Sequence, residues 1–461
     1  MGGNRSGTAL LAIGFACASS VAPLPPRPAS TLPDRAEPLA TSSSPPPVTT
    51  TARTIGSSGL TPHLSPDNDV VARIAVGWRL SAAAFSARAP WTIEYAGGDG
   101  TIARVPAGQA WNVETAGRML QVRREGAAAL EPRGTTVVLR PVSPDDAVLF
   151  AGKRYRGELR VFPTDTGLLV INRVGVEDYL RGVVPLEIGN RPQSDMAAAE
   201  AQAITARSYV YVRIRSRATA QYDILSDVRE QVYGGVEAER PVTDSAIAAT
   251  AGLGLFYDGQ LVDAPYHSTC GGATAAATEV WRTGVDRPWL RAISDRIPGT
   301  DRYWCDSSAA FRWTRTLAAA DLNASIRRYL RQYVAAAPAD PGAVRDIVEG
   351  RRTDSGRLAS VTVVTTRGRY DLRGNDMRFV LRSSNDQILN STSFSVEASR
   401  DGGTLRNVVL RGAGNGHGIG MCQWGAIGRA RAGQTARQIL AAYYVGTTVA
   451  RVAEADLRSA R

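Results

Sequence analysis

The sequence predicts an α+β protein in which a β-rich N-terminal module precedes a mixed α+β core with one long Ala-rich helix. Three observations support this fold class. Short alternating runs of apolar and polar residues, such as Trp91–Tyr95, are separated by Gly-rich turns up to about Phe150. The first long helical pattern comes after them, from Met196 to about Arg217. Beyond it, helical and strand patterns alternate without a fixed repeat period.

The composition is that of a folded chain with more than one unit. The 461 residues are 44% apolar and 21% charged, which is enough to build a sizeable core. No apolar run after the N-terminus approaches the roughly 20 residues that a membrane-spanning helix needs, so we expect no transmembrane segment there. The net charge is +11, with Lys153 as the single lysine. Such an arginine excess is compatible with nucleic acid, an anionic envelope polymer or genome composition.

The N-terminus resembles an export signal followed by a linker. Arg5 precedes the apolar run Thr8–Ala18, so residues 1–18 are expected to direct export to the periplasm or cell envelope. Cys17 offers lipid anchoring as an alternative to cleavage, although the residues before it form a poor lipidation motif. Residues 19–67 hold 11 of the 25 prolines and predict a disordered tether.

Three further units follow from the pattern. Residues 68–150 are expected to form the β-rich module, residues 151–452 the mixed core, and residues 453–461 a C-terminal tail. The long helix should turn one stripe toward a core, through Met196, Ala199, Ala203, Ala206, Val210 and Arg217. The remaining expected elements are strands at Glu158–Phe162, Gly167–Asn172, Leu358–Thr366 and Phe394–Ser399 and helices at Leu317–Ala336 and Ala436–Val445.

The first stretch with unusual chemistry is Val176–Ile188, where Glu187 follows a Val-Val-Pro-Leu run. A carboxyl group beside so much apolar surface is disfavoured in its charged form, which keeps a general acid protonated near neutral pH. The alternative is a glutamate that caps the next helix.

The second stretch lies in the long helix, between Ala199 and Tyr209. Gln202 and Arg207 could face a cleft, where a planar guanidinium suits carboxylates and sugar hydroxyls. The alternative pairs Arg207 with a local acid such as Glu200 on a solvated face.

The third stretch, Tyr266–Thr274, contains His267 and Cys270, and Cys305 follows 35 residues after Cys270. In an exported chain, a Cys270–Cys305 disulfide is the favoured interpretation. Zinc bound by His267, Cys270 and Cys305 is the alternative. A nucleophilic Cys270 activated by His267 is a third option, for which no orienting residue is evident.

The fourth stretch, Gly412–Ala426, places six glycines around His417, Gln423 and Trp424. Such a backbone can turn sharply and approach a ligand closely. Trp offers a flat face to a sugar ring, and His and Gln offer hydrogen bonds. The alternative is a tight turn with a packed Trp.

In this order, the four stretches resemble the stage II sporulation protein D and amidase-enhancer family, whose members act on bacterial peptidoglycan. The resemblance covers roughly Leu168 to Val449. Cys422 departs from the commonest family pattern, which has serine there. The motifs that carry the resemblance are Glu177–Glu187, Ala201–Tyr209, Cys270–Thr274 and His417–Ala426.

The resemblance implies a lytic transglycosylase domain over residues 151–452 that cleaves the glycan between N-acetylmuramic acid and N-acetylglucosamine. The product would carry a 1,6-anhydro end, and the preferred strands would lack stem peptides. Glu187 would be the catalytic acid and then base, a reaction that needs no second carboxylate. The residues expected to bind substrate are Gln202, Arg207, Tyr209, His417, Gln423 and Trp424.

The same resemblance leaves a non-catalytic alternative, a glycan-binding module that activates a cell-wall amidase. The expected partners are peptidoglycan strands and such an amidase. A nucleic-acid partner is not expected, because the N-terminus predicts export. No cofactor is required for the transglycosylase reaction, and zinc remains only the alternative to the disulfide.

Overall fold

The computed structural model describes residues 70–96, 100–227, 230–282 and 285–457. It confirms the α+β class, with 24% of residues in helices and 36% in strands. The expected export signal, including Cys17, and the linker lie outside the described residues. Within those residues, no helix combines the length and apolar character needed to cross a membrane.

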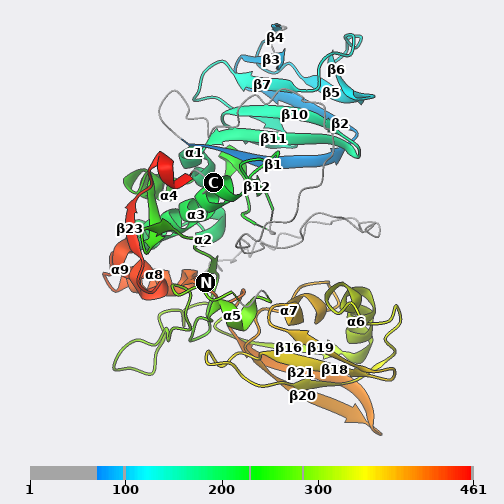
Figure 1. The fold of residues 1–461 in the computed structure, drawn as a ribbon, viewed down its shortest axis with the longest axis vertical. Coiled ribbons are helices and arrows are strands. Elements are labelled where there is room, and N and C mark those ends of the chain that lie inside the picture. The colour runs from blue at the N-terminus through cyan, green and yellow to red at the C-terminus, as the bar shows by residue number, and fades with distance from the viewer. Residues whose placement is uncertain (1–69, 97–99, 228–229, 283–284, 458–461) are drawn as a thin grey trace, which may run out of the picture. The chain divides into compact units, whose positions relative to one another are not determined.

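Two antiparallel-rich sheets dominate the N-terminal part of the described chain (Figure 1). Alternation builds their core, because Trp91, Ile93 and Tyr95 of one strand all point inward while their neighbours are partly exposed. The first sheet has the order β12 (Ile224–Leu225), β1 (Val71–Leu80), β11 (Gly167–Gly175), β10 (Glu158–Thr164), β7 (Val137–Pro141), β3 (Trp91–Tyr95) and β4 (Thr101–Val105). The second has the order β6 (Met119–Arg124), β5 (Trp111–Ala116), β2 (Ala82–Ala87), β8 (Val148–Phe150) and β9 (Lys153–Tyr155).

Strands from both sides of the expected division at residue 150 share these sheets. β1 pairs antiparallel with β11, with Val71 opposite Gly175, and β8 pairs with β9. The β-rich module therefore continues into the region that carries the motifs. Side-chain period alone could not show this, since it does not reveal which strands pair.

The helices that follow pack around α3 (Met196–Ser216). The sequence predicted one buried stripe on this helix, but the structure buries it on nearly all sides, polar residues such as Thr205 and Ser208 included. α3 contacts α4, α8, α9 and β13, so almost no face is left for solvent. Its neighbours include α1 (Val176–Arg181), α2 (Val184–Ile188), the 3-10 turn η1 (Gln193–Asp195), α4 (Pro241–Ala249), α8 (Gln423–Arg431), α9 (Ala436–Tyr443) and η3 (Glu454–Leu457).

A separate hydrophobic core lies between Leu317 and Leu410. Each expected element there is present with shifted ends. Its sheets are β16 (Arg312–Ala318), β21 (Thr404–Ala413) and β20 (Phe394–Asp401), and β17 (Val344–Glu349), β18 (Ser360–Thr365) and β19 (Arg369–Arg373). Its helices are α6 (Ala319–Tyr333) and α7 (Asp376–Val380).

A two-stranded parallel pairing joins the third and fourth stretches of unusual chemistry. β15 (Tyr266–His267) pairs with β22 (Met421–Cys422). Gly420 permits this approach, since its φ is +70° and a Cβ atom there would lie 1.9 Å from the Pro265 carbonyl oxygen. The remaining elements are β13 (Leu253–Tyr257), β14 (Gln260–Leu261), β23 (Thr448–Arg451), α5 (Ala277–Val280) and η2 (Gly235–Ala238).

Candidate active site

Glu187 lies in the five-residue helix α2, whose residues Val184, Pro185 and Ile188 are buried. Pro185 stands in the first turn, where a missing backbone N–H costs no helical hydrogen bond. Gly189 ends the helix with a φ of +80°, a conformation that favours glycine. The apolar run therefore forms a short, firmly packed support for one carboxyl group.

Burial raises the pKa of Glu187 from its ordinary 4.5 to about 7. Burial, and not a neighbouring carboxylate, is the principal cause of the shift. Hydrogen bonding from the Val232 backbone, the Tyr266 hydroxyl and the Gln423 side chain acts in the opposite direction and holds the pKa down. This raised pKa favours a protonated carboxyl at higher pH than is usual for glutamate, and the groups that hold the carboxyl are neutral donors.

Tyr266 is held against Glu187 by a chain of hydrogen bonds. The Gln231 amide donates to the Tyr266 hydroxyl over 3.2 Å, and the Tyr179 hydroxyl donates to Gln231 Oε1 over 3.1 Å. Tyr266 and Gln231 were not among the predicted site residues. Gln231 begins the Gln-Val-Tyr-Gly-Gly run that leads into η2, and Tyr266 begins the third stretch. Their places in these two runs were the sequence signal that could have identified them as site residues.

Gln423 and Gln202, both predicted to bind substrate, meet beside the same carboxyl. Gln423 Nε2 donates to Gln202 Oε1 over 3.2 Å, and both residues are buried. The Nε2 atom of Gln202 is buried without a hydrogen-bond partner among the described residues. An unpaired buried amide costs free energy, and a ligand oxygen could pair with this N–H only after the side chains that shield it move.

His417 supports the strand that carries Tyr266. Its Nδ1 accepts the Ile419 backbone N–H over 3.0 Å, and its ring interacts with the Tyr266 backbone. This arrangement assigns the remaining proton to Nε2. Burial and the Arg378 guanidinium lower the pKa of His417 to about 3. His417 is therefore neutral at physiological pH and suits a positioning role.

An arginine guanidinium lies over the aromatic ring of each of two further predicted binding residues, Trp424 and Tyr209. The Arg191 guanidinium lies 5.9 Å from the centre of the half-buried Trp424 ring. Arg213 lies 4.6 Å from the Tyr209 ring, and burial raises the pKa of Tyr209 to about 12. Trp424 follows Gln423 directly at the start of α8, and its backbone N–H donates to the Ser268 carbonyl over 3.1 Å.

A family model described as stage II sporulation protein matches residues 164–257, which include Glu187 and Gln202. Among characterised relatives, the amidase enhancer of Bacillus subtilis is 30% identical over 307 residues, which cover 59% of this chain and 40% of that protein. The stage II sporulation protein D of the same organism is 26% identical over 351 residues, covering 73% of this chain and 90% of that protein. These matches support the resemblance to the stage II sporulation protein D and amidase-enhancer family that the sequence motifs indicate.

Two further matches extend the comparison beyond this part of the chain. An uncharacterized protein of Brachyspira hyodysenteriae is 28% identical over 307 residues, covering 66% of this chain and 74% of that protein. A model described as a domain of unknown function (DUF8618) matches residues 297–420, which contain the separate C-terminal core. The similarity to these relatives supports a role related to the cell wall.

Arg207, which the sequence predicted to bind substrate, is fully buried in an ion pair. Its Nε and Nη2 atoms contact the two Glu177 carboxylate oxygens at 2.8 and 2.7 Å. Its remaining contacts are the carbonyls of Leu253 and Ile247. Arg207 therefore joins α3 to α1 and α4, and it could reach an external ligand only by leaving this pair. Its partner is not the local Glu200 on a solvated face, which was the alternative.

The three described cysteines, Cys270, Cys305 and Cys422, are free and buried. Cys270 and Cys305, the expected disulfide, have sulfur atoms 3.4 Å apart, beyond the bonded distance of about 2.05 Å. His267, expected in the alternative zinc set, directs Nδ1 to the Ile419 carbonyl over 3.1 Å. It is not among the clustered donor atoms around these sulfurs.

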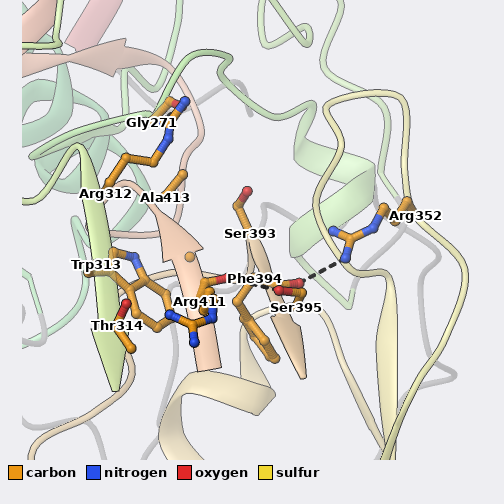
Figure 2. Close-up of a pocket in the computed structure, with 11 residues that line it drawn as sticks. Gly271, Arg312, Trp313, Thr314, Arg352, Ser393, Phe394, Ser395, Arg411 and Ala413 are labelled. Carbon is orange, nitrogen blue, oxygen red and sulfur yellow. Dashed lines mark hydrogen bonds between the residues drawn. The ribbon is translucent and has the colours of Figure 1, made fainter. Parts of the chain in front are cut away.

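An open pocket of about 670 Å³ lies on the sheet formed by β16, β21 and β20 (Figure 2). Arg312, Trp313 and Arg411 line it, together with Arg352, which donates to the Phe394 carbonyl over 3.0 Å. No Asp or Glu lines this pocket. It therefore lacks an acid–base group of the kind found around Glu187, and its cationic and aromatic surface suits binding rather than proton transfer.

Proposed function

We propose that the protein is a peptidoglycan lytic transglycosylase in which Glu187 acts as acid and then as base. The substrate would be the glycan bond between N-acetylmuramic acid and N-acetylglucosamine, on strands stripped of stem peptides. The observation that carries the proposal is the half-buried Glu187 carboxyl on α2, whose pKa of about 7 permits both roles near neutral pH.

In the first step, protonated Glu187 would donate its proton to the glycosidic oxygen as the bond from that oxygen to C1 of the muramic sugar breaks. The developing oxocarbenium-like sugar then needs a nucleophile. Its own C6 hydroxyl would supply it, losing its proton to the Glu187 carboxylate as O6 bonds to C1. The proton that leaves Glu187 is thus replaced, and a 1,6-anhydro ring forms without water.

This reaction differs from glycan hydrolysis in its carboxylate requirement. A water-using glycosidase needs a second acidic residue as base or nucleophile. The pKa shift of Glu187 arises mainly from burial, and its hydrogen-bonding neighbours Tyr266 and Gln423 are uncharged. That setting supports chemistry by a single carboxyl group.

The neighbouring donors have distinct roles in this proposal. Tyr266 and Gln423 favour the carboxylate that exists between the two proton transfers, since hydrogen bonds to the charged form lower a pKa. Gln202 would offer its unpaired Nε2 hydrogen to a sugar oxygen. Export to the periplasm or cell envelope belongs to the same proposal, because the substrate lies there.

The second candidate function is a non-catalytic glycan-binding activator of a cell-wall amidase. The match to a relative named amidase enhancer favours it. The arginine- and tryptophan-lined pocket is also compatible with binding an anionic glycan without cleaving it.

The experiment that tests the proposal is digestion of peptide-stripped and intact peptidoglycan, with mass detection of 1,6-anhydro ends. Wild type should release them, and Glu187→Gln should not. Glu125→Gln is the matched control, because Glu125 is exposed and lies in the N-terminal β-rich part. Anhydro ends from Glu187→Gln at the wild-type rate would reject the assignment. Absence of product from wild type, together with faster turnover of an added amidase, would establish the second candidate.

A further inference from the structure

A compact group of three cysteine thiols and one carboxyl group, none of which belongs to the groups around Glu187, is buried in the fold. Cys270, Asp295, Cys305 and Cys422 offer one donor atom each, and these atoms all lie within 4.8 Å of one another. None of the four residues is more than 2% exposed. They come from four separate segments of the chain, so the fold itself brings them together.

The spacing of the donors approaches that of a tetrahedral zinc site. The Cys270 sulfur lies 3.4 Å from the Cys305 sulfur and 3.4 Å from Asp295 Oδ2. Zinc binds thiolate sulfur at about 2.3 Å, which separates neighbouring sulfurs by about 3.8 Å in a tetrahedron. Three sulfurs and one carboxylate oxygen fill four positions, as in closed structural zinc sites.

Burial raises the pKa of the Cys270 and Cys422 thiols, but backbone N–H groups point at both sulfurs and would stabilise thiolates once a metal is bound. The Cys270 and Gly425 N–H groups donate to the Cys422 sulfur over 3.1 and 3.3 Å. The Gly272 N–H donates to the Cys270 sulfur over 3.4 Å. Hydrogen bonds to a charged form stabilise it, and a thiolate is the form that binds metal.

The carboxylate is oriented as a metal ligand's would be. The Tyr443 hydroxyl donates to Asp295 Oδ1 over 2.7 Å, and Arg429 contacts the same oxygen at 3.4 Å. The other oxygen, Oδ2, is the one that faces Cys270. Such outer hydrogen bonds fix the direction of a ligating group and are typical of metal sites.

Arg357 supplies an independent observation. It is only 1% exposed, and its Nε and Nη1 atoms have no hydrogen-bond partner among the described residues. Its Nη2 donates to the Cys270 carbonyl over 2.8 Å. Burying a guanidinium is costly unless negative charge lies nearby. Three thiolates and a carboxylate around one divalent ion would place a net negative charge near this cation, in addition to that of Glu279.

We propose that Cys270, Asp295, Cys305 and Cys422 bind one structural zinc ion. Binding displaces the protons of the three thiols and of any protonated Asp295, and it involves no oxidation. The ion would tie the segment after β15 to the end of β22, and Gln423 follows Cys422 directly. It would therefore stabilise the frame that holds Tyr266 and Gln423 beside Glu187, without touching substrate.

The test begins with the full chain purified without chelator. Elemental analysis should find one zinc per chain. The thiols of Cys270, Cys305 and Cys422 should react with a thiol reagent only after chelation. Cobalt(II) in place of zinc should give the visible absorption of a tetrahedral thiolate site. Chelation should also lower the melting temperature, because a structural metal contributes to folding.

Two ligand variants and a control sharpen the test. Cys422→Ser and Asp295→Asn should each weaken zinc binding, by roughly 100-fold or more. Asp306→Asn should leave it unchanged, since Asp306 pairs with the exposed Arg302 and is not in the cluster. Glu187→Gln should keep its zinc while losing activity, so the zinc proposal and the catalytic proposal can fail separately.

Two results would overturn the proposal. One is a Cys270–Cys305 disulfide, seen in peptide maps of unreduced protein as a linked pair lighter by two hydrogens. The other is metal-free protein with three thiols that react at once and a melting temperature that added zinc does not change. If the ligand variants fail to fold, the wild-type zinc content and thiol reactivity still decide between these outcomes.

Discussion

Gln423 donates its side-chain amide to Gln202 Oε1 over 3.2 Å, joining α8 to α3 across 221 positions of sequence. The same Gln423 side chain interacts with the Glu187 carboxyl. One residue near the C-terminus thus links the catalytic candidate on α2 to the central helix. The site is complete only when the last helices have packed against α3.

Gln423→Ala should lower the rate of anhydro-end release by roughly 10-fold to 100-fold, because an unsupported carboxyl is less well oriented. It should also raise the pKa of Glu187, since it removes a donor that favours the charged form. Rates measured across a pH series would show both effects. Gln260→Ala, at an exposed position on β14, is the control and should behave as wild type. An unchanged rate in Gln423→Ala would remove Gln423 from the site.

The pH profile of wild type should have a descending limb near pH 7. The first proton transfer needs protonated Glu187, whose pKa is raised to about 7, so activity should be retained below that value and fall above it. Measurement of kcat/KM on a soluble peptide-stripped glycan reports the pKa in the free protein. A rate that climbs steadily from pH 7 to 9 would contradict the acid role.

Tyr266→Phe should move that limb to higher pH. The Tyr266 hydroxyl interacts with the carboxylate form of Glu187, so its removal favours the protonated form. A hydrogen bond worth about 1 kcal/mol corresponds to a shift of roughly 0.7 pH unit. Tyr257→Phe is a matched control, because Tyr257 packs against Trp289 and is not among the groups that shift Glu187. A limb that stays in place would show that Tyr266 contributes only to packing.

Glu187→Gln should make the protein more stable at pH 8 while removing activity. The folded pKa of about 7 lies above the ordinary 4.5, so the free energy of unfolding of wild type falls as pH rises from about 4.5 to 7. Gln cannot ionise and avoids this loss, which amounts to about 3 kcal/mol above pH 7. Urea unfolding at pH 4 and pH 8 would measure it. If the variant is no more stable than wild type at pH 8, burial does not destabilise the charged form of Glu187.

The sequence predicted the features of this site that depend on local pattern. Glu187 stood out because a Val-Val-Pro-Leu run precedes it, and the apolar support it implies is present in α2. The Ala-rich helix and the Gly-rich segment before Gln423 were predicted for the same reason. Short-range composition was sufficient for the α+β class and for the helices α3, α6 and α9.

Features that depend on pairing between distant segments could not be predicted from the sequence. The pairing of β15 with β22, which aligns Tyr266 with Met421, cannot be inferred from two short segments about 150 residues apart. Asp295 had no motif around it, yet it lies among the three cysteines. A single sequence shows which residues carry chemistry, but their partners follow from the packing of distant segments.

Arg207→Met should destabilise the fold rather than weaken substrate binding. The variant would leave the Glu177 carboxylate without its bidentate partner and free the carbonyls of Leu253 and Ile247, at a cost of about 3 kcal/mol. Thermal or urea unfolding would measure the loss, with Arg118→Met at an exposed position as the control. Arg207→Lys should recover only part of the stability, because an ammonium group cannot bind both Glu177 oxygens in one plane. A variant with wild-type stability and a raised KM would instead show that Arg207 leaves its ion pair to hold a substrate carboxylate.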